Sequence, residues 1–407
     1  MFEYAKLIVM EEIRRYSQLK INKTSLNFRR YLLDEVEWED RLVGIKGARG
    51  VGKTTMMLQR MKEEYGLSKS ALYVTLDNFY FTKNRLFDFA EQFYSEGGKV
   101  LFIDEVHRYP TWSIEIKNLY DLYDDLKIVF SGSSVLQIHL ADGDLSRRAA
   151  MYSLHELSFR EYLELSGKFK FEKHSLESIL ENHEEIAAGI INEIAVIPLF
   201  KEYLKEGLYP FFKDAKGQFF DRLMNTVNVI IESDLQIIEG INYQTAFKLR
   251  QLVAVLSDSV PFKVNISELS RKVGLSRDVL LKLITSLDRA NLIKGLQQEG
   301  SAFGYLTKPD KIYLNNTALL YALNSGKNDI IGTVRETFFM NQMFKKNKVK
   351  SSKSGDFFID GKYTFEIGGR SKSFDQIAKI EYSYIAADEL EIGYGNKIPL
   401  WLFGFMY

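Results

Sequence analysis

The stretch GIKGARGVGKTTMMLQ, residues 44–59, places four glycines, two lysines and two threonines between an apolar run and an amphipathic one. It matches the pattern G-x-x-x-x-G-K-[ST]. In that pattern the glycine backbone presents N–H groups to phosphate oxygens, and the following helix adds its positive N-terminal end. The sequence therefore predicts a nucleotide-phosphate site. Its residues are Gly47, Ala48, Arg49, Gly50, Val51, Gly52, Lys53, Thr54 and Thr55.

Three of these residues have distinct expected roles. Lys53 can reach the β- and γ-phosphates, and the hydroxyl of Thr54 can ligate Mg²⁺. Arg49, inside the loop, is expected to face solvent or the rim of the nucleotide.

Two carboxylates follow a second apolar run, in KVLFIDEVHRYP. Asp104 would hold Mg²⁺ through water, and Glu105 would polarise the attacking water. Positioning and charge stabilisation supply nearly all the catalysis in phosphoryl transfer, so these two acids suffice for hydrolysis. The alternative is a strand that ends in ordinary solvated acids.

Two more polar groups could complete the site. The run KIVFSGSS supplies Ser131, Ser133 and Ser134 at a strand end, where open α/β sheets bind ligands. All three serines are candidates for sensing the γ-phosphate; a plain turn is the alternative. Arg147 and Arg148 could stabilise transition-state charge, in the same chain or in a neighbouring one. Otherwise they are surface arginines paired with acids.

Composition excludes several other classes of site. The 407 residues contain no cysteine, which excludes disulfides, thiolate zinc sites and cysteine nucleophiles, and fits a cytoplasmic protein. The five histidines lack H-E-x-x-H spacing. No signal peptide and no membrane span of about 18 apolar residues is present. The net charge is zero, so any contact with nucleic acid must be a local patch.

The elements that must position the nucleotide-phosphate site are predicted strands that alternate with helices. Residues 1–38 are predicted to be helical, and short apolar runs then alternate with amphipathic helices such as 112–126. This pattern predicts βαβ units and a parallel sheet buried on both faces. The runs are LVGIK (42–46), ALYVTL (71–76), VLFID (100–104), KIVFS (127–131) and MYSLHEL (151–157).

After residue 165 the pattern changes to long helical periodicity, which continues to about 258. Residues 264–296 then indicate a helix-turn-helix followed by a strand, with a second strand in KIYLNN, as in a winged helix. The last segment is predicted to contain a helix over 333–346 and strands in DFFID, YTFEIG and IPLWLFGF.

Taken together, GIKGARGVGKTTMMLQ, VLFIDEVHRYPTW, IVFSGSSVLQI and LSRRAAMYSLHELSFREYLEL resemble prokaryotic AAA+ ATPases. More narrowly, they are similar to the archaeal-type ATPase family, whose members carry a C-terminal domain of unknown function. The resemblance implies ATP as the nucleotide and an α/β P-loop fold of sheet order 5-1-4-3-2 with an N-terminal helix and a helical lid. It places Asp104 and Glu105 in Walker B, Ser133 or Ser134 at sensor 1, and Arg147 or Arg148 as the arginine finger.

The same resemblance implies four domains. A nucleotide-binding core would span residues 1–165, a helical lid 166–245, a winged helix 246–325, and a restriction-endonuclease-like α+β domain 326–407. In such a nuclease, acids and an E-x-K motif bind Mg²⁺ and activate water. Glycine at the lysine position predicts an inactive domain unless a nearby basic residue substitutes. The acids are Glu336, Asp356 and Glu366, the glycine is Gly368, and the substitutes are Lys362, Arg370 and Lys372.

The sequence leaves the partner open. A helix carrying Arg277, Lys282 and Arg289, and the lysine-rich segment 341–353, could bind DNA phosphates. A winged helix can equally bind a protein, and an oligomer is required only if the arginine acts on a neighbour. The expected function is Mg²⁺-dependent ATP hydrolysis coupled to rearrangement of the C-terminal domains on a protein or DNA partner. The alternatives are a slow ATP-gated switch and an ATPase-coupled nuclease.

Overall fold

The computed structural model divides the chain into two compact units, Met1–His155 and Glu156–Tyr407. For residues 2–8, 262 and 263 it describes the backbone alone. The described residues are 2–132, 145, 147–167, 169–236, 242–257, 262–263, 265–300, 308–324 and 330–407.

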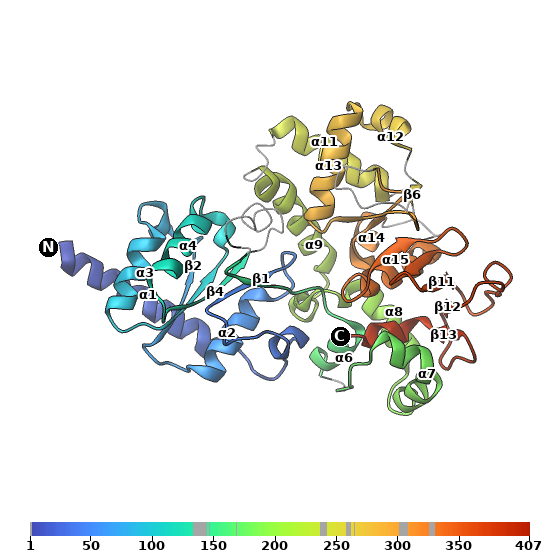
Figure 1. Ribbon diagram of the computed structural model, residues 1–407, viewed down its shortest axis with the longest axis horizontal. Helices are drawn as coiled ribbons and strands as arrows, with labels where there is room; N and C mark the ends of the chain where they lie inside the picture. The colour runs from blue at the N-terminus through green and yellow to red at the C-terminus, as the bar shows by residue number, and fades with distance from the viewer. Residues whose placement is uncertain are drawn as a thin grey trace. The chain divides into compact units, whose positions relative to one another are not determined.

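The first unit is built on a five-stranded parallel sheet of order β2-β3-β4-β1-β5, which confirms the predicted order 5-1-4-3-2. Strands β1 to β4 are almost entirely buried, as expected for a sheet covered on both faces, whereas β5, at one edge of the sheet, is half-buried. Figure 1 shows the sheet and its helices. The strands are β1 (Leu42–Lys46), β2 (Ala71–Thr75), β3 (Val100–Asp104), β4 (Lys127–Gly132) and β5 (Ala150–Ser153).

Helices cover both faces of this sheet. Phe102 and Phe130 point to opposite faces, because Phe130 pairs in register with Ile103, the neighbour of Phe102. Tyr65, at the end of α2, contacts Phe102, whereas Trp112 of α4 contacts Phe130. The helices are α1 (Phe2–Lys23), η1 (Tyr31–Asp34), α2 (Lys53–Glu64), η2 (Phe79–Thr82), α3 (Leu86–Ser95), η3 (Val106–Arg108) and α4 (Trp112–Leu122).

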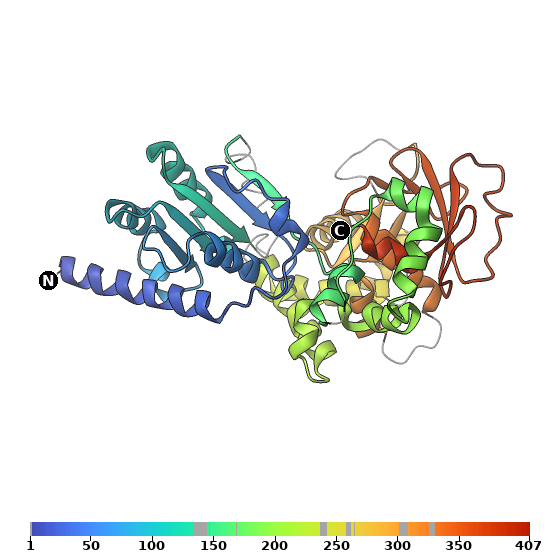
Figure 2. The ribbon, with the colours of Figure 1, turned by 90° about the horizontal axis from the view of Figure 1, so that it is seen from below.

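The prediction of helix over residues 1–38 is wrong beyond Lys23, where α1 ends; Figure 2 shows α1 as one long helix. Thr24 donates its hydroxyl hydrogen to the carbonyl of Lys20, and Ser25 accepts a hydrogen bond from the amide of Asn27. Such side-chain bonds to nearby backbone compete with helix continuation. Two carbonyls of this non-helical segment, from Ser25 and Phe28, instead accept hydrogen bonds from Gln59 of α2.

The second unit begins with helical elements, as the periodicity after residue 165 predicted. A three-stranded antiparallel sheet of order β6-β8-β7 then accompanies the helix–turn–helix of α12 and α13, which turns at Gly274 (φ 67°). The elements are α6 (Phe159–Leu165), α7 (Leu176–Ile191), α8 (Val196–Glu202), η4 (Tyr203–Gly207), η5 (Pro210–Asp214), α9 (Phe219–Val229), η6 (Ile230–Asp234), α11 (Tyr243–Ser257), β6 (Phe262–Lys263), α12 (Ile266–Val273), α13 (Arg277–Arg289), β7 (Ile293–Leu296), β8 (Lys311–Leu314) and α14 (Thr317–Leu323).

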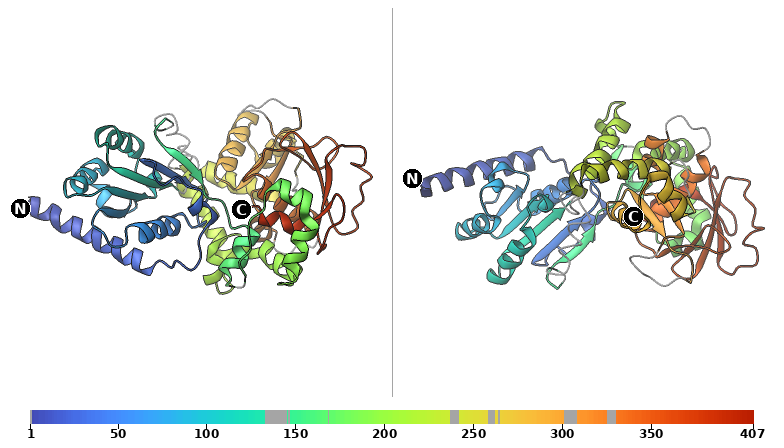
Figure 3. Two further views of the ribbon diagram at one scale, coloured as in Figure 1. Left: turned by 60° about the horizontal axis from the view of Figure 1, so that its bottom comes forward. Right: turned by 90° about the horizontal axis from the view of Figure 1, so that it is seen from above.

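The same unit ends in a five-stranded mixed sheet of order β13-β12-β11-β10-β9, packed on α15 through Phe339, Phe357 and Phe365 (Figure 3). Residues 156–407 thus form one compact unit, and their predicted division into lid, winged helix and C-terminal domain stays a prediction. The elements are α15 (Ile331–Met343), β9 (Val349–Ser351), β10 (Phe357–Ile359), β11 (Tyr363–Gly368), β12 (Ser383–Ala387), β13 (Lys397–Pro399) and η7 (Leu400–Phe405).

The predicted strand IPLWLFGF is wrong after Pro399, because residues 400–405 form the 3₁₀ helix η7. A continuous apolar run carries no periodicity that separates a strand from a buried helix. Here Pro399 starts the helix, Trp401 donates its indole N–H to the carbonyl of Leu390 at 3.0 Å, and Phe405 packs edge-on against Phe159.

Candidate functional site

The loop between β1 and α2 has the backbone of a phosphate cradle. Gly50 (φ 87°) and Gly52 (φ 99°) adopt positive φ values that other residues avoid. A Cβ at Gly47 would collide with the carbonyl oxygen of Leu154, just after β5, so only glycine fits there. The loop leads directly into the N-terminus of the twelve-residue helix α2, whose dipole favours an anion at that end.

Two buried cations hold this loop. Lys53 donates hydrogen bonds to the carbonyls of Gly47 and Ala48 at 2.9 and 3.0 Å. Arg30, which precedes η1, donates to the carbonyl of Val51 and, at 2.7 Å, to that of His155. The sequence analysis missed Arg30, because nothing in its local pattern distinguishes it from a surface arginine.

The hydroxyl of Thr54 lies 2.6 Å from Oδ2 of Asp104. This contact joins the helix that follows the phosphate loop to the end of β3. Two hard oxygen atoms at that distance, beside an anion-binding loop, are the donors that Mg²⁺ prefers. The residues present therefore fit the metal site that the sequence predicted for Thr54 and Asp104.

Asp104 is held by three more donors. Tyr73 of β2 donates its hydroxyl hydrogen to Oδ2 at 2.9 Å, and the backbone N–H of Glu105 donates to Oδ1 at 3.1 Å. Ser131 of β4 also donates to Oδ1. Ser131 was raised from sequence as a phosphate sensor, whereas in the structure its hydroxyl contacts Asp104.

Glu105 has a left-handed backbone, with φ 56° and ψ 39°. This conformation is rare for residues other than glycine and is concentrated at functional sites. Burial raises the pKa of the Glu105 carboxyl, and the positive charge of Lys53 opposes that shift. Its Oε2 is buried without a hydrogen bond. A carboxylate with raised basicity and an unsatisfied oxygen is suited to accept a proton from water.

His107 lies beside Glu105, with 3.3 Å between its Nε2 and Oε2 of Glu105. Burial lowers the pKa of His107 to about 3, so the ring is neutral near pH 7 and the contact is not an ion pair. The positive charge of Arg49 adds to the lowering of the His107 pKa and partly opposes the raising of the Glu105 pKa. Arg49 thus acts electrostatically on Glu105 and His107, and its expected place at the solvent side or at the rim of the nucleotide stays a prediction.

The remaining predicted residues are Thr55, two serines and two arginines. Ser133 and Ser134 lie outside the described residues. Thr55 is exposed on α2. Arg147 is exposed, and Arg148 donates two hydrogen bonds to the carboxylate of Asp121, at 2.8 and 3.0 Å.

The register of the sheet fixes where these arginines lie. The first residue of β5, Ala150, pairs with Val43 near the start of β1, and Ser153 pairs with Lys46 at its end. The phosphate loop follows Lys46, whereas Arg148 precedes Ala150. Arg148 thus lies where the parallel strands begin, whereas the loop lies where they end. The two are separated by at least about 10 Å along the strand direction.

Residues 39–163 match the family model of an AAA domain. This part of the chain has an AAA-type P-loop fold. Residues 197–329 match a domain of unknown function, DUF8612. The uncharacterized protein MJ1637 of Methanocaldococcus jannaschii is 26% identical over 406 residues, covering 90% of this chain and 84% of that protein.

Solved structures with a similar fold include the Walker-type ATPase PABY2304 of Pyrococcus abyssi. It is 12% identical with a TM-score of 0.41, over 76% of this chain and 95% of that one. AMPPCP-bound DnaA of Aquifex aeolicus is 17% identical with a TM-score of 0.27, over 63% of this chain and 84% of that one. At such TM-scores they assign no activity or partner to this chain.

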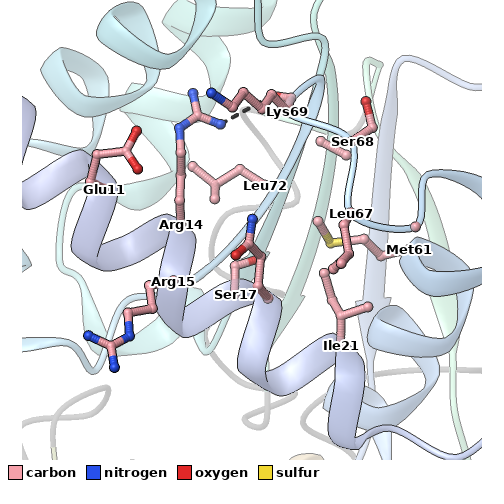
Figure 4. Close-up of a pocket in the computed structure, with 13 residues that line it drawn as sticks. Glu11, Arg14, Arg15, Ser17, Ile21, Met61, Leu67, Ser68, Lys69 and Leu72 are labelled. Atoms are coloured by element: carbon pink, nitrogen blue, oxygen red, sulfur yellow. Dashed lines mark hydrogen bonds between the residues drawn. The ribbon is translucent and has the colours of Figure 1, made fainter.

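A second, small cavity of about 80 Å³ lies away from the nucleotide loop, between α1, the end of α2 and the start of β2 (Figure 4). Arg14 spans it, donating to the carbonyl of Lys69 at 3.2 Å and to Glu96 at 3.1 Å. Because Arg14 forms these two hydrogen bonds, the residues around the cavity attach α1 to the rest of the first unit. No helix within the described ranges combines the length and apolar character needed to cross a bilayer.

The second unit contains the predicted acidic cluster. Tyr313 donates to Glu336 at 2.8 Å, and the amide of Ile367 donates to Asp356 at 2.8 Å. Burial raises the pKa values of Glu336, to about 7, and of Asp356 and Glu366. Across the part of the chain that the structure describes, no three acidic or histidine side chains converge closely enough to hold a metal ion.

Lys372, one of the three basic residues considered as substitutes from sequence, contacts an acid of this cluster. Its Nζ is 2.5 Å from Oε1 of Glu366. A Cβ at Gly368 would lie 2.8–2.9 Å from the Cβ, Cγ and Cδ atoms of Lys372, so the glycine makes room for that side chain. The other two substitutes considered from sequence are elsewhere: Lys362 lies over the rings of Tyr363 and Tyr382, and Arg370 is exposed.

Proposed function

We propose that this protein is a Mg²⁺-dependent ATPase of the AAA+ type that couples ATP hydrolysis to rearrangement of its second unit on a protein or DNA partner. The observation that carries the proposal is the 2.6 Å contact between Thr54 and Asp104, with Glu105 next in the chain. It joins the phosphate loop to the acids that hydrolysis requires.

The residues have separate roles in this proposal. The loop N–H groups and Lys53 bind phosphate, and Lys53 exchanges its two loop carbonyls for phosphate oxygens. Mg²⁺, held by Thr54 and Asp104, supplies neutralisation of phosphate charge when bound. Glu105 orients the attacking water and accepts its proton, which its raised pKa favours.

We place the arginine finger of this ATPase in a neighbouring subunit. Arg147 and Arg148 lie where the parallel strands begin, whereas the loop of the same chain lies where they end. This separation supports action on a second copy. This arrangement favours action across a subunit boundary over action within the same chain, the two alternatives that the sequence left open.

Phosphate release by the wild type and by Glu105→Gln tests the proposal. The variant is expected to bind ATP normally and to lose activity by about 100-fold or more. Glu39→Gln is the control, since Glu39 is an exposed acid of the same unit that pairs with Lys127. If both the wild type and Glu105→Gln release phosphate equally slowly while still binding ATP, the protein is the slow ATP-gated switch instead.

A second candidate function, an ATPase-coupled nuclease, is supported by one observation. The Lys372 side chain passes beside Gly368 and contacts Glu366, so it could replace the lysine that is absent from the E-x-K position. The acids would have to draw together to bind a metal ion.

Incubation with supercoiled plasmid and Mg²⁺ tests this function. Cleavage by the wild type that is lost in Asp356→Asn and Lys372→Ala, and kept in Lys362→Ala, would establish it. Absence of cleavage by the wild type would leave the domain without nuclease activity, as the sequence predicted.

DNA is a candidate partner for two surfaces of the second unit. Arg277 and Lys282 of α13 are exposed, as a phosphate-binding helix requires. In segment 341–353, however, Lys345 is buried in an ion pair with Glu156, so it does not contribute to a basic surface.

A further inference from the structure

Tyr73 donates to Asp104 from β2, a strand that contributes no other residue to the proposed nucleotide site. Its hydroxyl is 2.9 Å from Oδ2, and the residue is only 2% exposed. Thr54 donates to the same oxygen, while Ser131 and the Glu105 amide donate to Oδ1. These donors hold both oxygens of the carboxylate from several sides.

The register of the sheet explains how a tyrosine reaches this carboxylate. Thr75 of β2 pairs with Asp104, and Tyr73 pairs with Phe102, two residues earlier on the same face. Two residues of strand span about 6.6 Å, which is close to the length of a phenol side chain. A shorter apolar residue at position 73 would fill the sheet face equally well but would leave Oδ2 without this donor.

The hydroxyl of Tyr73 is a fixed donor. A phenol has an ordinary pKa of about 10, so this hydroxyl is protonated near neutral pH and can donate. The terminal torsion of an aspartate is otherwise broad, and its carboxylate can rotate. With Tyr73 on one oxygen and Ser131 on the other, Asp104 is held in a single orientation in which Oδ2 faces Thr54.

We propose that Tyr73 is a positioning residue for the Mg²⁺ site: its hydroxyl fixes the Asp104 carboxylate against Thr54 and thereby sets the Mg²⁺ affinity of the ATP-bound protein. This inference rests on the proposed ATPase function, and it adds a residue of β2 to a site otherwise built from the phosphate loop and β3. Ser131 supports Asp104 from the other oxygen.

Tyr73→Phe keeps the ring and removes only the donor. Loss of a residue that orients a metal ligand typically costs about 10–100-fold in metal affinity. The Mg²⁺ concentration that gives half-maximal tightening of nucleotide binding should therefore rise about 10-fold. Nucleotide affinity in EDTA should not change, because the loop N–H groups and Lys53 are untouched. Ser131→Ala should shift the Mg²⁺ dependence in the same direction.

The experiment is a Mg²⁺ titration of the full-length protein with a fluorescent ATP analogue, followed by fluorescence and without reference to turnover. The matched control is Tyr65→Phe, since Tyr65 packs against Phe102 in the same unit and has no contact with Asp104. Thermal unfolding in EDTA verifies folding. If Tyr73→Phe does not fold, Ser131→Ala tests the same restraint from the other oxygen.

The outcomes separate this inference from the proposed function. Wild-type protein that binds the analogue with Mg²⁺ dependence, while Tyr73→Phe and Ser131→Ala shift that dependence and Tyr65→Phe does not, supports the inference. Equal Mg²⁺ dependence in wild type and Tyr73→Phe, or in wild type and Ser131→Ala where only that variant folds, overturns it and leaves the ATPase proposal standing. A wild type that binds no nucleotide overturns both.

Discussion

Arg148 forms two parallel hydrogen bonds with Asp121, at the end of α4, on the side of the sheet away from the phosphate loop. This bidentate pair keeps the guanidinium extended along one edge of the unit. Because Asp121 and Arg148 are both partly exposed, the pair can present the guanidinium to a nucleotide bound by a second copy. In the proposed function, Asp121 would support an arginine that works between subunits.

Arg148→Ala is expected to lower phosphate release by about 10³-fold, since an arginine finger supplies that order of rate enhancement. ATP binding should be retained. Mixing Arg148→Ala with the loop variant Lys53→Ala should restore part of the activity, because mixed assemblies contain a subunit with an intact loop beside an intact arginine. Phosphate release from mixtures measures this restoration; no recovery at any ratio would contradict action between subunits.

Arg30→Ala is expected to weaken ATP binding even though Arg30 is remote from the loop in sequence. The guanidinium joins the carbonyls of Val51 and His155, so its loss frees the loop and removes a charged donor from both carbonyls. Hydrogen bonds that involve a charged group contribute about 1.5–3 kcal/mol, equivalent to a rise of roughly 10–100-fold in the Kd for ATP.

Titration calorimetry measures that Kd. Arg29→Ala is the matched control, because Arg29 is exposed and pairs with Asp34 and Glu63 on the surface. An unchanged Kd in Arg30→Ala would mean that the loop keeps its shape without this support.

The sequence was sufficient to predict the parts of the site whose chemistry is local. The glycines, Lys53 and Thr54 are adjacent in the chain, and Asp104 and Glu105 end an apolar run. Their strands alternate with amphipathic helices, so the sheet order could also be expected from the resemblance.

Tyr73 and Arg30 could not be predicted, because their roles depend on register and tertiary contact. Tyr73 is one aromatic residue within a buried strand, and only its pairing with Phe102 brings the hydroxyl to Asp104. The position of the Lys372 side chain beside Gly368 likewise depends on how the chain returns after β11. The helical course of residues 400–405 follows from packing against Phe159, which is far away in sequence.

The stability of the second unit should depend on pH through Glu336. Burial raises the pKa of this carboxyl to about 7, above the ordinary glutamate value of about 4.3. Between these values the folded state binds more protons than the unfolded state, so the free energy of unfolding decreases as pH rises from about 4.3 to about 7. Asp356 and Glu366 shift in the same direction.

Glu336→Gln should remove part of that slope and should gain stability relative to the wild type as pH increases. Urea unfolding at several pH values measures this. Glu177→Gln, in an exposed position of the first turn of α7, should leave the slope unchanged. A wild-type curve that is flat from pH 5 to 7 would contradict the raised pKa.

The last prediction concerns a buried ion pair that joins distant parts of the second unit. Lys345 and Glu156 are 3% and 4% exposed and 2.8 Å apart, and Asn315 donates a further hydrogen bond to Glu156 at 2.7 Å. Removing one partner leaves a buried charge unpaired, so Lys345→Met should lower the free energy of unfolding by about 3–5 kcal/mol.

Replacing both partners should cost much less. Lys345→Met combined with Glu156→Gln leaves no buried charge and keeps an acceptor for Asn315, so most of the lost stability should return. Lys353→Met, an exposed lysine of the same basic segment, should change stability by no more than about 0.5 kcal/mol. Urea unfolding of the four proteins measures these differences. If Lys345→Met and Lys353→Met are equally mild, Lys345 is hydrated in solution and belongs to the basic surface after all.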